Sequence, residues 1–128
     1  MATPRFSHLD DRLVHQGHVW HVAVARFSAP SGEVFERDIV RSPGAVAAVP
    51  LLVGDDGEPI VVMVRQYRPP LDAWVLEIPA GMRDVPDEPT ETTAARELEE
   101  EVGLRAGSLR HLLDFRPSAG MTDSTLYL

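Results

Sequence analysis

Polar and apolar residues alternate in part along the first third of the chain. Residues 13–27, LVHQGHVWHVAVARF, are rich in valine, tryptophan and phenylalanine, which predicts one β-strand. The turn-forming residues SAPSG follow, and residues 33–41, EVFERDIVR, alternate as a second strand. We therefore expect an antiparallel β-hairpin near the start of the chain.

The middle of the chain contains two apolar runs separated by a turn. AVAAVPLLV (residues 45–53) ends at the turn GDDGEP, and IVVMVRQYR (residues 60–68) is apolar up to its arginines. Continuous apolar runs of strand length are typical of strands covered on both faces, so we expect both at the centre of a sheet. A short strand, VLEIP (residues 75–79), and a loop over residues 80–89 follow.

The pattern takes the period of a helix over residues 90–102. The apolar stripe of this predicted helix is formed by Ala94, Ala95, Leu98 and Val102. Pro89 suits the first helical turn, and Gly103 is placed to end the helix in a left-handed conformation. Residues 109–115 and 124–128 predict further strands, the second of them unfinished at Leu128.

Strands followed by one strong helix and more strands predict an α/β (α+β) fold. We expect an N-terminal strand unit over residues 1–40 and a main domain over residues 41–128 that is incomplete at its C-terminus.

Composition and charge restrict the function classes. A net charge of −8 argues against a nucleic-acid-binding protein, whose binding face is basic. No apolar run approaches the roughly 18–20 residues that span a bilayer, so we expect no membrane partner. The absence of cysteine and of a secretory signal pattern favours a cytoplasmic location.

The sequence RELEEEVGL, residues 96–104, concentrates negative charge on the predicted helix. At 100° per residue, Glu97 and Glu101 point almost the same way, with Glu100 on the neighbouring flank. These carboxylates border the apolar stripe, where bare charge is costly, and they suit a hard divalent cation. Arg96 and Glu99 point away, although Arg96 can pair with Glu100 at i+4. A solvated surface helix with excess glutamate is the alternative.

The segment GMRDVPDEPTETTAARELEEEVGL, residues 81–104, resembles the Nudix box. The positions that match its pattern are Gly81, Glu88, Arg96, Glu97, Leu98, Glu100, Glu101, Gly103 and Leu104. Six residues rather than five separate the glycine from the first glutamate, an expansion familiar in ADP-ribose pyrophosphatase-like members. The stretches RSPGAVAAVPLL, VVMVRQYRPP, WVLEIPAGM and PSAGMTD also resemble that group, so the resemblance covers residues 41–123.

The resemblance implies a Nudix fold, a mixed β-sheet sandwiched between helices, and a cation site. Its metal ligands, for Mg²⁺ or Mn²⁺, would be the Ala80 carbonyl, Glu88, Glu97, Glu100 and Glu101. Its catalytic residues would be Arg96, Glu97, Glu100 and Glu101. The implied reaction is hydrolysis of a nucleoside diphosphate sugar, with ADP-ribose giving AMP and ribose 5-phosphate.

Arginines at the end of a predicted strand are candidate substrate contacts. We expect Arg65 and Arg68 to project to one face and to bind phosphate oxygens, which arginine forks match. Ordinary strand-end cations are an equally weighted alternative. Met82 is a candidate for the sugar or base pocket, or a packing residue, and Glu77 and Arg41 are weaker candidates. We expect Trp74 in the core or an interface.

Some features leave alternatives open. Relatives of this type carry a catalytic glutamate downstream of the box, beyond Leu128, so a nucleotide-binding or regulatory module with little or no catalysis is the second hypothesis. The resemblance also implies a homodimer built by the N-terminal strands. His15, His18 and His21 would share one face of a helix, but a strand separates them, which disfavours a zinc site.

Overall fold

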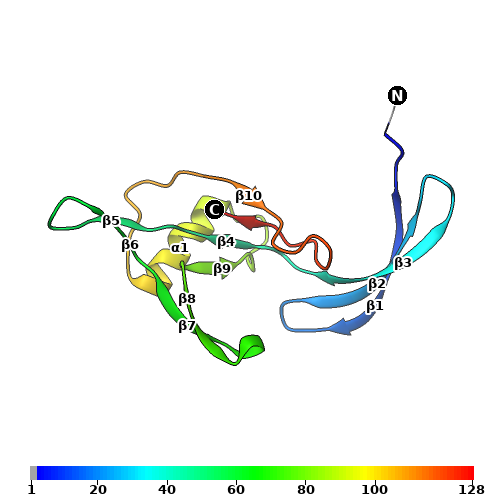
Figure 1. The fold of residues 1–128 in the computed structure, drawn as a ribbon, viewed down its shortest axis with the longest axis horizontal. Coiled ribbons are helices and arrows are strands. Elements are labelled where there is room, and N and C mark those ends of the chain that lie inside the picture. Colours follow the sequence, from blue (N-terminus) through cyan, green and yellow to red (C-terminus); the bar gives the residue numbers. More distant parts are fainter. Residues whose placement is uncertain (1–2) are drawn as a thin grey trace. The chain divides into compact units, whose positions relative to one another are not determined.

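The structure, a computed structural model, describes residues 3–128 (Figure 1). The chain forms two compact units. One comprises the chain up to Pro43 together with Arg116–Ser124, and the other comprises Gly44–Phe115 with Thr125–Leu128.

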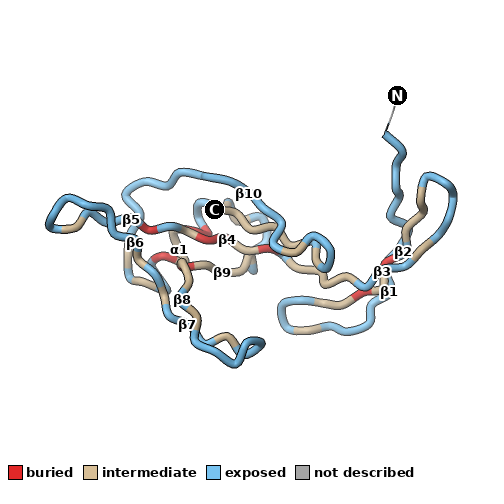
Figure 2. Tube along the Cα trace, in the orientation of Figure 1, coloured by how far each residue is buried: buried red, intermediate tan, exposed pale blue. Residues whose placement is uncertain are grey.

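The first unit is a three-stranded antiparallel sheet of order β1-β2-β3. Its strands are β1 (Ser7–Gln16), β2 (His21–Ser28) and β3 (Val34–Arg41). Ala23 and Ala25 on the central strand are buried (Figure 2). The segment Arg116–Ser124 joins this unit through a parallel bridge between Val40 and Thr122.

The predicted single strand over residues 13–27 is wrong, because the chain turns back between Gly17 and Trp20. The Gly17 N–H donates to the Trp20 carbonyl at 2.9 Å, and a Cβ at Gly17 would lie 2.7 Å from that oxygen. The close approach needs glycine. The predicted hairpin is confirmed between β2 and β3.

The second unit contains a mixed sheet of order β10-β11-β4-β9. Its strands are β4 (Ala45–Ala47), β9 (Ala80–Met82), β10 (Asp114–Phe115) and β11 (Leu126–Tyr127). β11 runs parallel to β4, and the other pairs are antiparallel. The helix α1 (Thr90–Val102) packs on β9 and β4. The mixed sheet and the α+β class are confirmed. Among residues 3–128, α1 is the one α-helix that covers the sheet.

The prediction of buried central strands is confirmed only for the start of the first apolar run, where β4 lies inside the mixed sheet with Val46 and Ala47 buried. The remainder of the two runs forms separate two-stranded ribbons, and for these the prediction is wrong. β5 (Leu51–Val53) pairs with β6 (Pro59–Val61), and every residue of both is exposed. β7 (Val64–Arg68) pairs with β8 (Ala73–Glu77) across the 3₁₀ turn η1 (Pro69–Leu71). Pro50 interrupts the first run, since it has no N–H to donate to a sheet. Strand structure in the C-terminal segment is shorter than predicted, reduced to β10 and β11.

The predicted helix is confirmed over Thr90–Val102. Thr93, Ala94 and Leu98 are its buried residues, so the sheet-facing stripe is centred on Ala94 and Leu98. Pro89 is the N-cap, one position before the predicted first turn, and Gly103 ends the helix with φ 67°. Neither described helix, η1 or α1, is long and apolar enough to cross a membrane.

Replacing Gly103 by alanine is expected to destabilise the protein by about 1–2 kcal/mol, because a Cβ is disfavoured in the left-handed region. Urea unfolding measures this as a lower midpoint at unchanged slope. Gly107→Ala is the matched control, since an added Cβ there meets nothing within 4 Å and its φ is not positive. Equal midpoints for the two variants would contradict the cap assignment.

Candidate active site

Two glutamates of α1 lie against the backbone of β9. The Ala80 N–H donates to Glu101 Oε2 at 3.0 Å. A Cβ at Gly81 would lie 2.0 Å from Glu97 Cδ, so the absence of a side chain makes room for this carboxylate. The structure therefore brings Ala80, Glu97 and Glu101 together, with Glu97 and Glu101 on the same side of the helix, as the spacing predicts.

Arg96 holds the acidic cluster from the other side. Its guanidinium contacts Glu97 at 3.0 Å, Glu88 at 3.1 Å, Asp84 at 3.4 Å and Glu100 at 3.6 Å. The predicted pair with Glu100 is confirmed. The expectation that Arg96 points away from the cluster is wrong, because its long side chain reaches both the loop before the helix and the carboxylates along it. The hydrogen bonds to Glu88 raise the pKa of Arg96, so its charge is fixed.

Glu88 is anchored between the loop and the helix. Its carboxylate accepts hydrogen bonds from Thr93 Oγ1 at 2.7 Å and from Arg96 Nη2 at 3.1 Å. The Arg96 hydrogen bond, followed by that of Thr93, lowers the pKa of Glu88. Glu88 is thus an ionised group that fixes where the Arg96 guanidinium lies.

The pKa of Glu97 is shifted in the opposite direction. Burial raises the pKa of its carboxyl, and the charges of Glu100, Glu101 and Asp84 raise it further against the opposing effect of Arg96. The charged form is therefore costly as the structure stands. A bound cation would relieve that cost.

The donor chemistry of this cluster fits a hard divalent cation, since carboxylate oxygens are the ligands that Mg²⁺ prefers. Within residues 3–128, however, no three side chains of His, Cys, Asp or Glu are grouped closely enough to hold a metal ion. Arg96 and the Ala80 N–H occupy carboxylate oxygens that a cation would use. Binding would therefore require Glu97 and Glu100 to exchange contacts with Arg96 for contacts with the ion.

The candidate phosphate-binding arginines lie on the ribbon β7–β8. Arg68 makes a two-point pair with Glu77, Nε to Oε1 at 2.8 Å and Nη2 to Oε2 at 2.5 Å. Arg65 lies over the ring of Trp74, 5.7 Å from its centroid. The expectation that both arginines project to one face is wrong, because residues three apart in a strand point to opposite faces. Trp74 is 63% exposed, so it is not a core residue of its unit.

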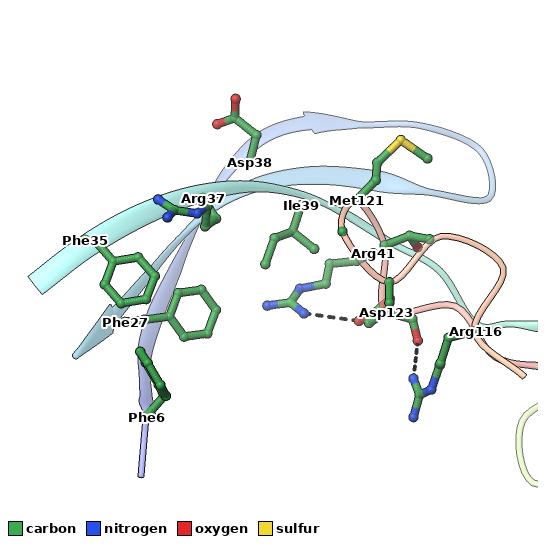
Figure 3. A pocket seen from close by; sticks show the side chains of 13 residues that line it. Phe6, Phe27, Phe35, Arg37, Asp38, Ile39, Arg41, Arg116, Met121 and Asp123 are labelled. Atoms are coloured by element: carbon green, nitrogen blue, oxygen red, sulfur yellow. Dashed lines mark hydrogen bonds and ion pairs between the residues drawn. The ribbon is translucent and has the colours of Figure 1, made fainter. Parts of the chain in front are cut away.

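Arg41 and Met82 occupy different units. Met82 ends β9, half-buried, opposite Ala45 of β4. Arg41 ends β3 in the first unit and pairs with Asp11 at 2.9 Å. It also pairs with Asp123 at 3.2 Å (Figure 3). It borders a hollow of about 580 Å³. Phe6, Phe27 and Phe35 line one part of that hollow, and Arg116 and Met121 line another.

Two residues of the second unit that sequence reasoning missed support the cluster. Thr93 is completely buried and binds Glu88. Arg83, in the spacer of the box, donates through Nη2 to the Glu88 carbonyl at 3.1 Å. A polar residue on the apolar side of the helix is a signal that identifies Thr93. The spacer sequence carries no comparable signal for Arg83.

In the absence of divalent cations, Glu97→Gln is expected to unfold at a higher urea concentration than the wild type at pH 7. The folded-state pKa of Glu97 lies above the ordinary value of 4.5, so its charge destabilises the fold as pH rises through that range. The difference is expected to vanish below about pH 3, where the carboxyl is protonated in both the folded and the unfolded state. The control is Glu99→Gln, whose side chain is 58% exposed. A lower midpoint for Glu97→Gln at pH 7 would mean that the Arg96 pair outweighs burial.

The sequence matches known proteins over most of its length. The family model described as NUDIX domain matches residues 42–126. ADP-ribose pyrophosphatases of Bacillus subtilis and Mycobacterium tuberculosis are 40% and 36% identical over 90% and 98% of this chain. A CMP-5'-(N-acetyl-N-hydroxy-3-aminopropyl)phosphonate hydrolase of Streptomyces rubellomurinus is 43% identical over 89% of it.

The chain spans 53–60% of the lengths of these relatives. A solved structure described as an ADP compounds hydrolase superposes with a TM-score of 0.77, covering 99% of this chain and 65% of that one at 23% identity. That structural similarity shows the fold. The family model and the sequence identities show the protein family. The chain belongs to the NUDIX domain family.

Proposed function

We propose that this protein catalyses the cation-dependent hydrolysis of a nucleoside diphosphate sugar, with ADP-ribose as the first candidate. Addition of water across the phosphoanhydride bond would give AMP and ribose 5-phosphate. The observation that carries the proposal is the placement of Glu97 and Glu101 against β9, with Glu100 beside them and Arg96 holding the cluster.

The names of the relatives support a nucleotide substrate. Two relatives are ADP-ribose pyrophosphatases, and the third hydrolyses a CMP-linked phosphonate. In these names a nucleotide is the shared part, while the base and the second group vary. We therefore propose that this chain recognises a nucleotide, and we treat ADP-ribose as one member of a class of substrates.

The proposed cation is Mg²⁺ or Mn²⁺. Glu97, Glu100 and Glu101 would hold it with the Ala80 carbonyl, and Glu88 would support them. When bound, such an ion neutralises phosphate charge and orients water for attack on phosphorus. Arg96 would keep its contact with Glu88 and give up its contacts with Glu97 and Glu100 to the cation. On the ribbon β7–β8, Arg68 is our candidate for a phosphate contact, because its fork already binds a carboxylate at two points.

A second candidate function is nucleotide binding without cleavage. It is favoured by the lack, within residues 3–128, of a preformed group of three acidic or imidazole side chains for a metal. In that case the contacts between Arg96 and the carboxylates would persist in the nucleotide complex.

Glu101→Gln is expected to lower the rate of ADP-ribose hydrolysis at least about 100-fold. Loss of a residue that only hydrogen-bonds to a metal ligand typically costs about 10–100-fold, and loss of a ligand itself should cost more. The reason is the loss of a negative oxygen donor. Chromatography of AMP and ribose 5-phosphate, with Mg²⁺ present or chelated, measures it. Glu99→Gln, on the outer side of the helix, is the matched control. Nucleotide binding by the wild type without products would instead support the second candidate.

We also propose a homodimer built through the first unit. Strand β1 is an edge strand of ten residues, all exposed, and a long exposed edge is a template for pairing. The edge carries the apolar side chains of Leu9, Leu13 and Val14.

Sedimentation of the protein at micromolar concentration is expected to show a dimer. Leu13→Lys should shift it toward monomer, because a charge would be placed in an apolar contact. Val34→Lys, on the opposite edge strand and similarly exposed, should not. A monomeric wild type would contradict the proposal.

A further inference from the structure

Arg83 connects three segments of the second unit. Its backbone N–H donates to the Gly44 carbonyl at 3.0 Å, directly after strand β9. Its Nη2 donates to the Glu88 carbonyl at 3.1 Å. Its guanidinium carbon lies 5.1 Å from the centre of the Tyr127 ring on β11, within the range of a cation–π contact. The side chain therefore stands between the central sheet and the end of the loop before α1.

The Arg83 guanidinium is held at a cost. Its Nε is buried and, within residues 3–128, has no hydrogen-bond partner. Leaving a buried donor unpaired is unfavourable, because the hydrogen bond that it made to water in the unfolded chain is not replaced. The contacts with Glu88 and Tyr127 must offset this cost, so the side chain is fixed by the segments that it joins.

Glu88, whose carbonyl binds Arg83, also contacts Arg96. The Glu88 carbonyl bonded to Arg83 belongs to the residue whose carboxylate binds Arg96 through two nitrogens, Nε at 3.4 Å and Nη2 at 3.1 Å. The remaining nitrogen of Arg96, Nη1, contacts Glu97 and Glu100. If Glu88 moved, Arg96 would lose those two bonds and would bind the helix carboxylates more strongly.

We propose that Arg83 is a positioning residue that keeps Glu88 on Arg96 and so limits how strongly Arg96 binds Glu97 and Glu100, the contacts that a divalent cation must displace. This inference rests on the proposed function, because it concerns cation binding at the same cluster. Arg83 touches neither cation nor substrate in this scheme. It acts through Glu88, whose carbonyl it binds.

The test measures Mn²⁺ binding by electron paramagnetic resonance in wild type and Arg83→Met. The variant is expected to bind Mn²⁺ about 10–100-fold more weakly, the usual effect of outer contacts on metal affinity. Substrate KM at saturating Mn²⁺ should stay near the wild-type value. Arg105→Met is the matched control, since that arginine is 87% exposed and contacts only the outer Glu99 in the described part of the chain. Unchanged Mn²⁺ affinity in Arg83→Met would overturn the proposal.

A double variant separates positioning from general destabilisation. If Arg83 acts through Glu88, Arg83→Met combined with Glu88→Gln should bind Mn²⁺ no more weakly than Glu88→Gln alone. Additive losses would overturn the proposal. Should Arg83→Met fail to fold, Arg83→Lys and Tyr127→Leu take its place and are expected to bind Mn²⁺ more weakly than the wild type. Tyr127→Phe keeps the ring that contacts Arg83, so it should keep the wild-type Mn²⁺ affinity.

Amide exchange distinguishes failure of this inference from failure of the proposed function. The Glu88 N–H is bonded to the Val85 carbonyl at 3.3 Å, and its exchange should be up to about tenfold faster in Arg83→Met, the equivalent of one hydrogen bond. A wild type that binds no Mn²⁺ contradicts the proposed function. Unchanged exchange of the Glu88 amide contradicts the role of Arg83, whatever the metal result.

Discussion

The second unit depends on one positive charge placed among carboxylates of a single helix and its preceding loop. Like charges at helical spacing each cost a few tenths of a kcal/mol, and Glu97 is also half-buried, so the helix is electrostatically unfavourable by itself. Arg96 offsets this by contacting Glu88, Glu97, Glu100 and Asp84 together. A planar guanidinium can do so because its five donors point in fixed, different directions. A divalent cation at the proposed site would have to compete with these contacts.

Small residues let that helix approach the sheet closely. Gly81 leaves room for the Glu97 side chain, and Ala94 packs toward β9 and β4, where Ala47 is buried. The carboxylates therefore lie at the backbone of β9, where the Ala80 N–H donates to Glu101. Carboxylate oxygens are ligands that hard cations favour. The fold thus supports the proposed chemistry through close packing of helix on strand, with little help from large apolar side chains.

The sequence predicts local features well and tertiary pairing poorly. The helix 90–102 is predictable because its stripe and Gly103 are local signals, and the pair of Arg96 with Glu100 follows from helix geometry. The turn at Gly17 is not predictable in this way, because the residues on both sides of it have the apolar pattern of a strand. The reversal depends on one close backbone contact. The exposure of β5 and β6 depends on which other segments pack on them, and the hydrophobic pattern of a strand does not predict that. Arg83 works through a backbone carbonyl, and no residue pattern encodes such a partner.

The ribbon of β5 and β6 bears on how this protein behaves while it folds. Its strands expose leucine, valine and isoleucine side chains, a composition that favours intermolecular strand addition. The connecting turn carries Asp55 and Asp56, and Glu58 follows within the same tight loop. Acidic residues that flank an apolar strand act as gatekeepers, because stacked copies would bring like charges together. Neutralising this turn would therefore promote aggregation of the nascent chain without changing the acidic cluster of α1.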